Sequence, residues 1–571
     1  MRIKPNASLG LLAAGTLAIL GCGEGVKEEQ KKRPNIVLIM ADDVCPFHFS
    51  TYKRINPVYP DWNVSTPNID KLAAAGMIFD RAYTTASAST PSRYSTLTGQ
   101  YPGRCDSKEF KDENPAGEPY CMAWNTPISE NSPTLHKLLL SAGYFTGFVG
   151  KFHIGELEFD DPSGKHVPSI DENIESSDPN CDKAMLNYQK ILQAEIKRLT
   201  GANFAASILW ENSSELPVAK LRNHNLEWLT RGVAQFLDST QKNGPFFLHF
   251  NTTALHGPNH DESLRTSAKY TPQGTMTDTL MYHPDRKSIY LRLEKMGIKF
   301  DEKTPDWVKH YYVGILYLDD QIGVVLKLLK DKGLDENTVV ILAADNGIEP
   351  GKSTCYEMGV NIPLIVKYPG ITAKGSRSSA LISFADLFPT LAEIGGAKMP
   401  QNIKFDGMSI VEAMKGHELK GRDHLYMEMG YTRAIVTDKF KYIAMRYPKK
   451  VSEEIASGKA KSISHFGAKS QVHASVSMQY MPNFFDADQL YDLSLDSYEQ
   501  KNLATEVDYS SKLSEMKGLL QKELQSTPYP FDLADIEIFT HPNYLKLAAE
   551  ARKLGSSIVP WWKRNIIFPP K

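Results

Sequence analysis

Residues 35–43 read NIVLIMADD. The short, unbroken apolar run of this stretch is typical of a strand buried on both faces, and the run ends directly in Asp42 and Asp43. Residues 338–344, TVVILAA, repeat the pattern and end in Asp345 and Asn346. Both runs predict central strands of a mostly parallel sheet. Because sites in such sheets form beyond the carboxyl ends of the strands, we expect the functional site there.

Strands and helices alternate on either side of these two runs. Further strands are expected over 144–149, 246–250 and 362–366, and helices over 225–237 and 307–330. Thr66-Pro67 and Ser132-Pro133 each predict a helix start, with a hydroxyl residue as N-cap and proline at the first helical position. The alternation predicts an α/β domain over 34–421, with a large mostly parallel sheet flanked by helices.

The pattern changes after residue 421. Residues 432–436 and 440–444 alternate on either side of a short polar turn and predict an antiparallel hairpin. A strand over 489–493 and a helix over 509–524 follow a polar segment. We therefore expect a smaller C-terminal α+β domain, 422–571, with its own antiparallel sheet. A chain of 571 residues is also too long for one ordinary core.

The first 21 residues have the layout of a lipoprotein signal peptide. Arg2 and Lys4 precede an apolar run that is too short to span a membrane. Cys22 follows a small residue, as in a bacterial lipobox, so we expect it to carry lipid; the alternative is a plain signal peptide with an incidental cysteine. Residues 22–33 are charged and predict a solvated tether. These features predict an exported bacterial lipoprotein, periplasmic or on the cell surface, that meets the membrane through its lipid only.

Composition narrows the function classes. The 65 Lys+Arg and 67 Asp+Glu residues give a net charge of −2, so no basic excess indicates nucleic-acid binding. With 42% hydrophobic and 23% charged residues, wholesale disorder is excluded. No Cys/His spacing of a metal site is present. Cys105 and Cys121 flank a polar loop and could pair; the alternative is that they are reduced, buried cysteines.

Four oxygen-bearing side chains follow the two buried strands. Asp42, Asp43, Asp345 and Asn346 offer the ligands that a hard divalent cation prefers. Three carboxylates at one sheet edge would also repel one another without a cation to offset their charge. Either pair taken singly is more often a turn or a helix cap, but the shared strand-end position favours a cation site.

Residues 89–99 read STPSRYSTLTG, which resembles the signature of the sulfatase family, Cys or Ser-x-Pro-Ser/Ala-Arg followed by Leu-Thr-Gly. In that family the first residue is oxidised to formylglycine, whose hydrated gem-diol form is the nucleophile. Ser89 stands at this position. Ser87, Ser92 and Ser95 lack the proline and arginine at the required spacing.

The rest of the family pattern appears in chain order over about residues 34–500. The matching segments are GKFHIG (150–155), LHGP (255–258), DNG (345–347), Lys352 to Tyr356-Glu357, LYDL (490–493) and NLA (502–504). Phe152 replaces the usual tryptophan and Leu255 the usual proline. Asn361 stands where arginine is common, which puts one charge around the site in doubt.

The resemblance implies a role for each matching residue. One Ca²⁺ would be held by Asp42, Asp43, Asp345, Asn346 and the hydrated aldehyde made from Ser89. Arg93 would hold the other formylglycine hydroxyl, and Lys151 and Lys352 the sulfate oxygens. His256 would be the general acid for the departing alkoxide, and His153 would help to expel sulfate. His260 is not assigned a role.

Serine at position 89 resembles sulfatases matured by an anaerobic-type radical S-adenosylmethionine enzyme, which implies a bacterium and such a maturase as partner. An exported sulfatase is expected to act on sulfated glycans of mucin, glycosaminoglycan or algal origin. The loops expected to set specificity are 106–125, 156–182, 259–282 and 449–485. The last contains Lys461, His465, Lys469 and His473, which could contact sugar or sulfate or simply lie in a solvated loop.

Two other functions compete with this one. A formylglycine-dependent phosphonate or phosphate ester hydrolase would share the fold. However, two-metal members need extra His and Asp ligands, and Asn346 stands where a histidine would be expected. A lipid-anchored glycan-binding protein with unconverted Ser89 is the non-enzymatic alternative, against which the complete catalytic pattern argues. Fold alone names no substrate.

Overall fold

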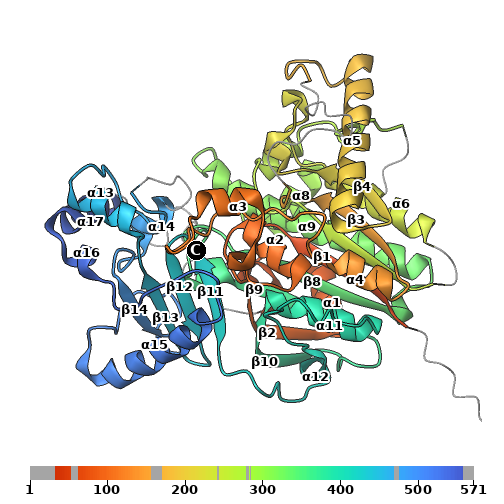
Figure 1. Ribbon diagram of the computed structural model, residues 1–571. Helices are drawn as coiled ribbons and strands as arrows, with labels where there is room; N and C mark the ends of the chain where they lie inside the picture. Colours follow the sequence, from red (N-terminus) through yellow and green to blue (C-terminus); the bar gives the residue numbers. More distant parts are fainter. Residues whose placement is uncertain are drawn as a thin grey trace, which may run out of the picture. The chain divides into compact units, whose positions relative to one another are not determined.

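The computed structural model describes residues 33–52, 62–155, 170–240, 244–277, 282, 284–468 and 475–556 (Figure 1). The predicted signal peptide, Cys22, Lys469 and His473 lie outside these residues. By internal contacts the chain divides into residues 1–32 and 33–571, and the fold below is that of the second unit. Among its described helices, none combines the length and apolarity that crossing a bilayer requires.

An eight-stranded sheet forms the centre of this unit, in the order β10-β2-β9-β8-β1-β5-β3-β4. Its strands are β1 (Asn35–Ala41), β2 (Met77–Tyr83), β3 (Phe145–Lys151), β4 (Phe204–Leu209), β5 (Phe246–Asn251), β8 (Thr338–Ala344), β9 (Asn361–Lys367) and β10 (Ser376–Ser383). All pairs are parallel except those of β9, which runs antiparallel to β8 and β2. The predicted mostly parallel sheet is therefore confirmed, with β1 and β8 as central, fully buried neighbours.

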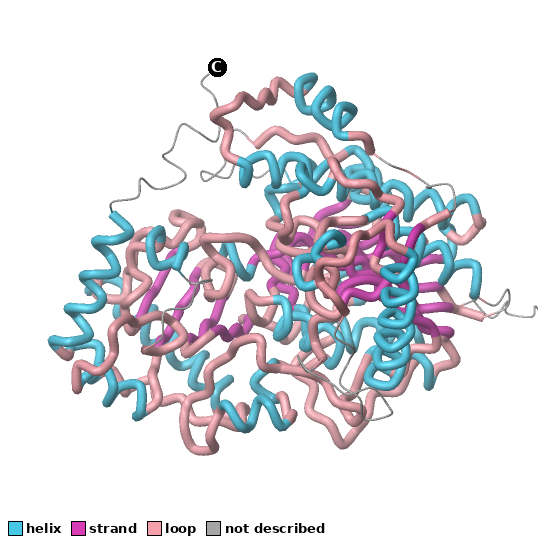
Figure 2. Tube along the Cα trace, turned by 90° about the horizontal axis from the view of Figure 1, so that it is seen from above, coloured by secondary structure: helices cyan, strands magenta, loops and turns pink. Residues whose placement is uncertain are grey.

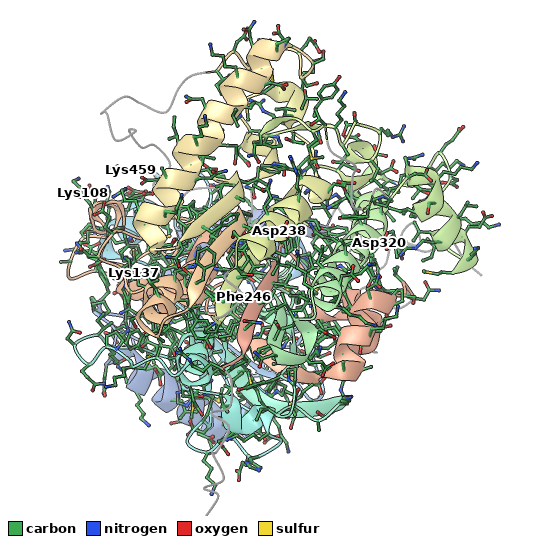
Figure 3. The ribbon with its side chains drawn as sticks, turned by 90° about the vertical axis from the view of Figure 1, so that its right-hand side faces the viewer. Lys108, Lys137, Asp238, Phe246, Asp320 and Lys459 are labelled. Carbon is green, nitrogen blue, oxygen red and sulfur yellow. The ribbon has the colours of Figure 1, made fainter. Side chains whose placement is uncertain are left out.

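Helices cover both faces of the large sheet (Figure 2). One set is α1 (Pro67–Ala75), α6 (Leu226–Ser239) and α9 (Asp306–Asp331), which contact one another in series. The other set is α2 (Ser89–Thr98), α4 (Leu135–Ser141) and α11 (Leu387–Gly395). An ion pair of 2.6 Å between Asp320 of α9 and Arg292 holds α8 (Arg286–Lys295) against α9, and Asp320 is labelled in Figure 3.

One predicted helix start is confirmed and the other is displaced by two residues: Thr66 is the N-cap residue of α1 and Pro67 its first residue, whereas the second helix starts later than expected. Thr66 makes no side-chain capping bond to α1; instead Asp319 of α9 accepts hydrogen bonds from the backbone N–H groups of Asn68 and Ile69, at 3.0 and 2.9 Å. The helix expected from Ser132-Pro133 begins at Leu135, with Thr134 as its N-cap. Local sequence could not show the role of Asp319, because this residue lies about 250 positions from the helix start that it caps.

A second sheet of four antiparallel strands lies in the C-terminal part, in the order β11-β12-β13-β14. Its strands are β11 (Leu425–Met429), β12 (Thr432–Val436), β13 (Phe440–Met445) and β14 (Asp488–Asp492). Helix α15 (Ser510–Leu524) packs on it through Met516, Leu520 and Leu524. The predicted hairpin and second sheet are confirmed, while the domain boundary at 421/422 remains a prediction.

The remaining helices and strands of the described fold lie outside the two larger sheets and the helices named above. They are α3 (Lys108–Glu113), α5 (Pro179–Thr200), α7 (His260–Ser263), α10 (Glu357–Val360), α12 (Val411–Met414), α13 (Lys449–Ala456), α14 (Ser475–Tyr480), α16 (Glu537–Thr540), α17 (Pro542–Ser556), β6 (Tyr270–Thr271) and β7 (Gly274–Thr275). Cys105 follows β2 and α2 in the chain, and its buried thiol donates to Ser107 Oγ at 3.3 Å. Of the two alternatives for this cysteine, the structure shows the reduced one.

Candidate active site

The carboxyl ends of β1 and β8 meet as the sequence predicts. Ala41 pairs with Ala344 in the parallel register, and the next N–H, that of Asp345, donates to Ala41 O at 3.0 Å. This register places Asp42 and Asp43 beside Asp345. Carboxylate oxygens of the three lie within 4.8 Å of one another.

Backbone bonds fix the orientation of these acids. Asp345 Oδ1 accepts the N–H groups of Asp43 and Asn346 at 3.2 and 2.8 Å. Asp43 has φ of 58°, a left-handed conformation that aspartate tolerates better than most residues. Asn346 Nδ2 then donates to Asp43 Oδ1 at 2.7 Å. Asp43, Asp345 and Asn346 thus form one hydrogen-bonded network, and Asp42 lies beside it.

Ser89 is the first residue of α2 and is 1% exposed. Its Oγ lies 3.3 Å from Lys151 Nζ and 3.5 Å from Asn346 Oδ1, so the helix start faces the acidic cluster. The other serines of this segment are engaged elsewhere, since Ser92 Oγ donates to the backbone of Asp345 and Ser95 Oγ accepts from a neighbouring threonine. The structure thus brings Ser89 to the site, as the motif predicts.

Three buried cations face the three carboxylates. Arg93 contacts Asp345 Oδ2 through two nitrogens, at 3.0 Å (Nε) and 2.9 Å (Nη2). In separate pairs, Lys151 Nζ lies 2.7 Å from Asp42 Oδ2 and Lys352 Nζ lies 2.6 Å from Asp43 Oδ2.

The pKa values follow from this arrangement. Burial alone would raise the pKa of the Asp42 carboxyl, but Lys151, His256 and Arg93 outweigh it and hold that pKa below its usual value. Asp43 behaves likewise beside Lys352. Conversely, the Lys352 ammonium is buried, yet Asp43 and Asp42 raise its pKa. Burial lowers the pKa of the Lys151 ammonium, although Asp42 opposes this shift. The charged forms of Asp42, Asp43 and Lys352 are therefore the favoured ones.

The formal charges of these six side chains cancel, because three are negative and three are positive. A bound divalent cation would therefore make the site positive and suited to an anionic ester. Asp42 Oδ1 is buried and has no hydrogen-bond partner among the described residues. A buried carboxylate oxygen without a donor fits a metal ligand, and the all-oxygen donor set fits a hard cation such as Ca²⁺.

Two histidines border the cluster. His256 Nδ1 donates to Gly257 O at 2.9 Å, which leaves Nε2 of the neutral ring with its lone pair. Burial, Lys352 and Lys151 lower the pKa of His256. His153 adopts φ of 55°, its buried Nδ1 has no hydrogen-bond partner, and burial beside Lys151 and Arg93 lowers its pKa well below the usual value. Both rings are neutral when no substrate adds negative charge.

Other residues of the family pattern hold the two sheets together. Tyr356 Oη donates to Gln489 Oε1 at 2.8 Å, and Glu357 pairs with Lys441 Nζ of β13 at 2.8 Å. Their contribution to the site is the placement of the segment that follows Lys352. Asn361, which replaces the usual arginine, is buried and donates to Ala82 O at 3.3 Å.

Sequence reasoning missed one acid in the site. Glu349 lies three residues after Asn346, and its buried Oε2 has no hydrogen-bond partner among the described residues. Burial outweighs the opposing charge of Lys352 and raises the pKa of Glu349 to about 8. Ile348, the residue before Glu349, belongs to a small apolar cluster with Cys45, Phe47 and Met358. An acid between the DNG segment and Lys352 was visible in the sequence, but its burial was not.

The expected specificity loops are only partly described, because 156–169, 278–281 and 469–474 fall outside the described residues. Within them, His465 is fully buried, stacks on Phe484 with ring centroids 3.7 Å apart, and bonds to Phe484 O through Nε2. It is a core residue, unlike the exposed Lys461.

Comparisons with known proteins agree with this site. Residues 34–397 match the family described as Sulfatase, and 351–455 match the one described as N-sulphoglucosamine sulphohydrolase, C-terminal. Among curated relatives, an N-acetylgalactosamine-6-O-sulfatase of Bacteroides thetaiotaomicron is 25% identical over 76% of this chain and 87% of its own length. An ulvan-active sulfatase of Formosa agariphila is 26% identical, over 89% and 77% respectively.

A solved structure, in complex with its substrate D-glucosamine-2-N,6-O-disulfate, shares the fold with a TM-score of 0.54. It is 18% identical and covers 89% of this chain and all of its own. The family match includes both strand ends, Ser89 and the two lysines, and it spans more than half of the chain. The chain therefore belongs to the sulfatase family, enzymes that hydrolyse sulfate esters.

Proposed function

We propose that this sulfatase removes sulfate from sulfated glycans, using formylglycine made from Ser89 and one Ca²⁺. The observation that carries the proposal is the position of Ser89, buried at the start of α2 and 3.3 Å from Lys151 Nζ, beside three carboxylates. The glycan class is supported by the substrates named for the relatives, which include amino-sugar sulfates and ulvan. The sugar and the sulfated position that the enzyme recognises are to be identified with the substrate panel described below.

The two groups that the family implies fit the residues present. Formylglycine at position 89 would supply a hydrated aldehyde as nucleophile, and Ca²⁺ held by Asp42, Asp43, Asp345 and Asn346 would offset charge on the sulfate oxygens. Lys151 and Lys352 lie on either side of the cluster and hold the anionic ester. A sulfuryl group carries its charge on peripheral oxygens, so positioned cations contribute more than a strong base would.

Protons are moved by the two histidines. His256 donates from Nε2 to the leaving sugar oxygen, because its Nδ1 is engaged with Gly257 O. An anionic ester beside Lys151 and Lys352 offsets the charges that lower the pKa of His256 and so favours its protonated form. His153 would accept the proton of the second hydroxyl of hydrated residue 89 during sulfate release. Arg93, held by Asp345, orients that residue.

Maturation and location belong to the same proposal. A serine-type radical S-adenosylmethionine maturase converts Ser89 before export, and Cys22 then carries the lipid that anchors the enzyme outside the cytoplasm. Labelled fatty acid incorporated by wild type and lost in Cys22→Ala is the expected result. Equal labelling of both chains would contradict the anchor without touching the catalytic proposal.

The test of activity is sulfate release by protein produced together with a serine-type maturase. The panel contains N-acetylgalactosamine 6-sulfate, N-acetylglucosamine 6-sulfate, D-glucosamine-2-N,6-O-disulfate, and oligosaccharides of ulvan and carrageenan, beside a phosphonate monoester. We expect release from at least one sulfated sugar, lost in Ser89→Ala and on removal of Ca²⁺. Preferred turnover of the phosphonate would favour the alternative hydrolase. If protein with verified formylglycine binds glycans but turns none of them over, the proposed sulfatase activity on these glycans is wrong.

A further inference from the structure

Three histidines without an assigned role line the loop that carries His256; His224 and His260 are buried, and His310 is half-buried. His224 precedes α6, His260 begins α7, and His310 lies in the first turns of α9. The rings of His224 and His260 stack with centroids 3.9 Å apart and 7° between their planes, and His310 follows at 4.6 Å. Three separate elements thus converge on residues 253–258.

The partners of His224 settle its tautomer. His224 Nε2 lies 2.8 Å from His256 O and 2.8 Å from Pro258 O. Carbonyl oxygens only accept, so Nε2 carries the proton and donates to both. Nδ1, 2.9 Å from Thr253 Oγ1, then accepts the threonine hydroxyl of the same loop. One ring therefore binds the loop on both sides of His256.

The partners of His310 settle the other two rings. His310 Nε2 lies 2.7 Å from Leu255 O and must donate to it. Its Nδ1 therefore accepts, and it receives the ring Nδ1–H of His260 at 3.1 Å and the backbone N–H of His260 at 3.3 Å. Burial lowers the pKa of His224 to about 3 and that of His310 to about 4, in agreement with neutral rings.

The packing of α9 is shaped for this arrangement. A Cβ added to Gly314, one turn after His310, would lie 2.8 Å from His260 Nδ1 and 2.8 Å from Leu255 Cδ2. Real side chains do not approach this closely, so glycine is needed for the helix to reach the histidines.

We infer that His224 and His310 are positioning residues for His256, which hold the backbone carbonyls of residues 255, 256 and 258 and so set where its Nε2 lies. The inference rests on the proposed role of His256 as general acid. Neither histidine is assigned a contact with substrate. Because proton donation depends on geometry, a displacement of about 1 Å is expected to slow the step about 100-fold.

The test compares two leaving groups. A sugar oxygen leaves as a basic alkoxide and needs a proton, whereas the phenolate of para-nitrophenyl sulfate leaves without one. For the fastest sugar sulfate of the panel, we expect His224→Ala and His310→Ala to lower kcat about 100-fold with little change in KM. Hydrolysis of the aryl sulfate should fall only a few-fold. His224→Gln should recover much of the loss, because its amide N–H can donate in place of Nε2–H.

Two further variants make the outcome decisive. His256→Ala must itself show the leaving-group selectivity; if it does not, the proposed function fails at His256 and the premise of this inference falls with it. If His256→Ala is selective and the His224 and His310 variants slow both substrates equally, the positioning role is wrong. Should the alanine variants fail to fold, Gly314→Ala replaces them, because it displaces the cluster without removing a histidine. A larger loss on the sugar sulfate than on the aryl sulfate would support the positioning role, and equal losses would contradict it.

Discussion

Lys151→Met is the substitution whose consequences the structure defines most closely. Lys151 and Asp42 are both 0% exposed, and Nζ and Oδ2 are 2.7 Å apart. Removing one partner of a buried ion pair leaves the other uncompensated, which costs about 3–5 kcal/mol. Arg93 Nη2 stays 3.8 Å from Asp42 Oδ1 and offsets part of that charge, so we expect a loss of about 3 kcal/mol.

That loss converts into a measurable change of Tm. The entropy of unfolding of a chain this long is about 1 kcal/mol per kelvin, so Tm in EDTA should fall by about 3 °C. Saturating Ca²⁺ at about 100 times its Kd adds about 2.7 kcal/mol to a chain that binds it. In the variant no ammonium occupies Asp42, so the Ca²⁺-dependent rise of Tm should exceed that of wild type. Sulfate release should fall about 100- to 1000-fold, because a donor to the sulfate oxygens is lost.

The assay is thermal unfolding in EDTA and in Ca²⁺, followed by sulfate release. The matched control is Lys327→Met, the same change at an exposed ion pair with Asp331, which should alter stability by less than about 0.5 kcal/mol. Equal Tm values for Lys151→Met and wild type in EDTA would refute the pairing argument. Equal Ca²⁺ increments in both chains would refute the assignment of Asp42 to the cation.

Three more predictions follow from single contacts. Burial would lower the pKa of His424, but its contacts with Glu523 and Asp423 outweigh burial and raise that pKa above 6.5. The resulting stabilisation is complete below pH 6.5 and is lost as pH rises through the raised pKa. His424→Gln should therefore lower the free energy of unfolding by up to about 1 kcal/mol at pH 6 and hardly at all at pH 9. Equal losses at the two pH values would count against this ion pairing. Gly150→Ala places a Cβ 1.8 Å from Asn251 O at φ of 99°, so it should shift the strand end and lower both Tm and sulfate release, whereas wild-type values would rule out the close approach. Arg93→Lys cannot keep two nitrogens on one carboxylate oxygen and should lower kcat about 100-fold with the fold retained by circular dichroism; unchanged kcat would contradict its role.

The elements that sequence predicted well are those with a local physical cause. Residues 36–41 and 339–344 are apolar at every position because both faces of a central strand are covered, and each run is followed directly by an acid. Ser89 was found from a motif whose proline and arginine occur within four residues. The parallel register of β1 and β8, with Ala41 opposite Ala344, then places the three acids side by side.

Features that depend on distant partners escaped prediction. The antiparallel direction of β9 within the large sheet follows from its connections, not from its composition. The capping of α1 by Asp319 joins residues about 250 positions apart. The His224, His260 and His310 cluster is invisible in sequence for the same reason, since its members are separated by 36 and 50 residues and belong to three elements.

In the proposed mechanism, residue 89 acts only after conversion to formylglycine. The most direct measurement determines, in preparations made with increasing amounts of maturase, the fraction of residue-89 peptide lighter by two hydrogen atoms, together with sulfate release by the same preparation. The account predicts activity proportional to the converted fraction, with none in unconverted chains or in Ser89→Ala. Sulfate release by unconverted protein, or fully converted protein inactive on every sulfate ester of the panel, would contradict it.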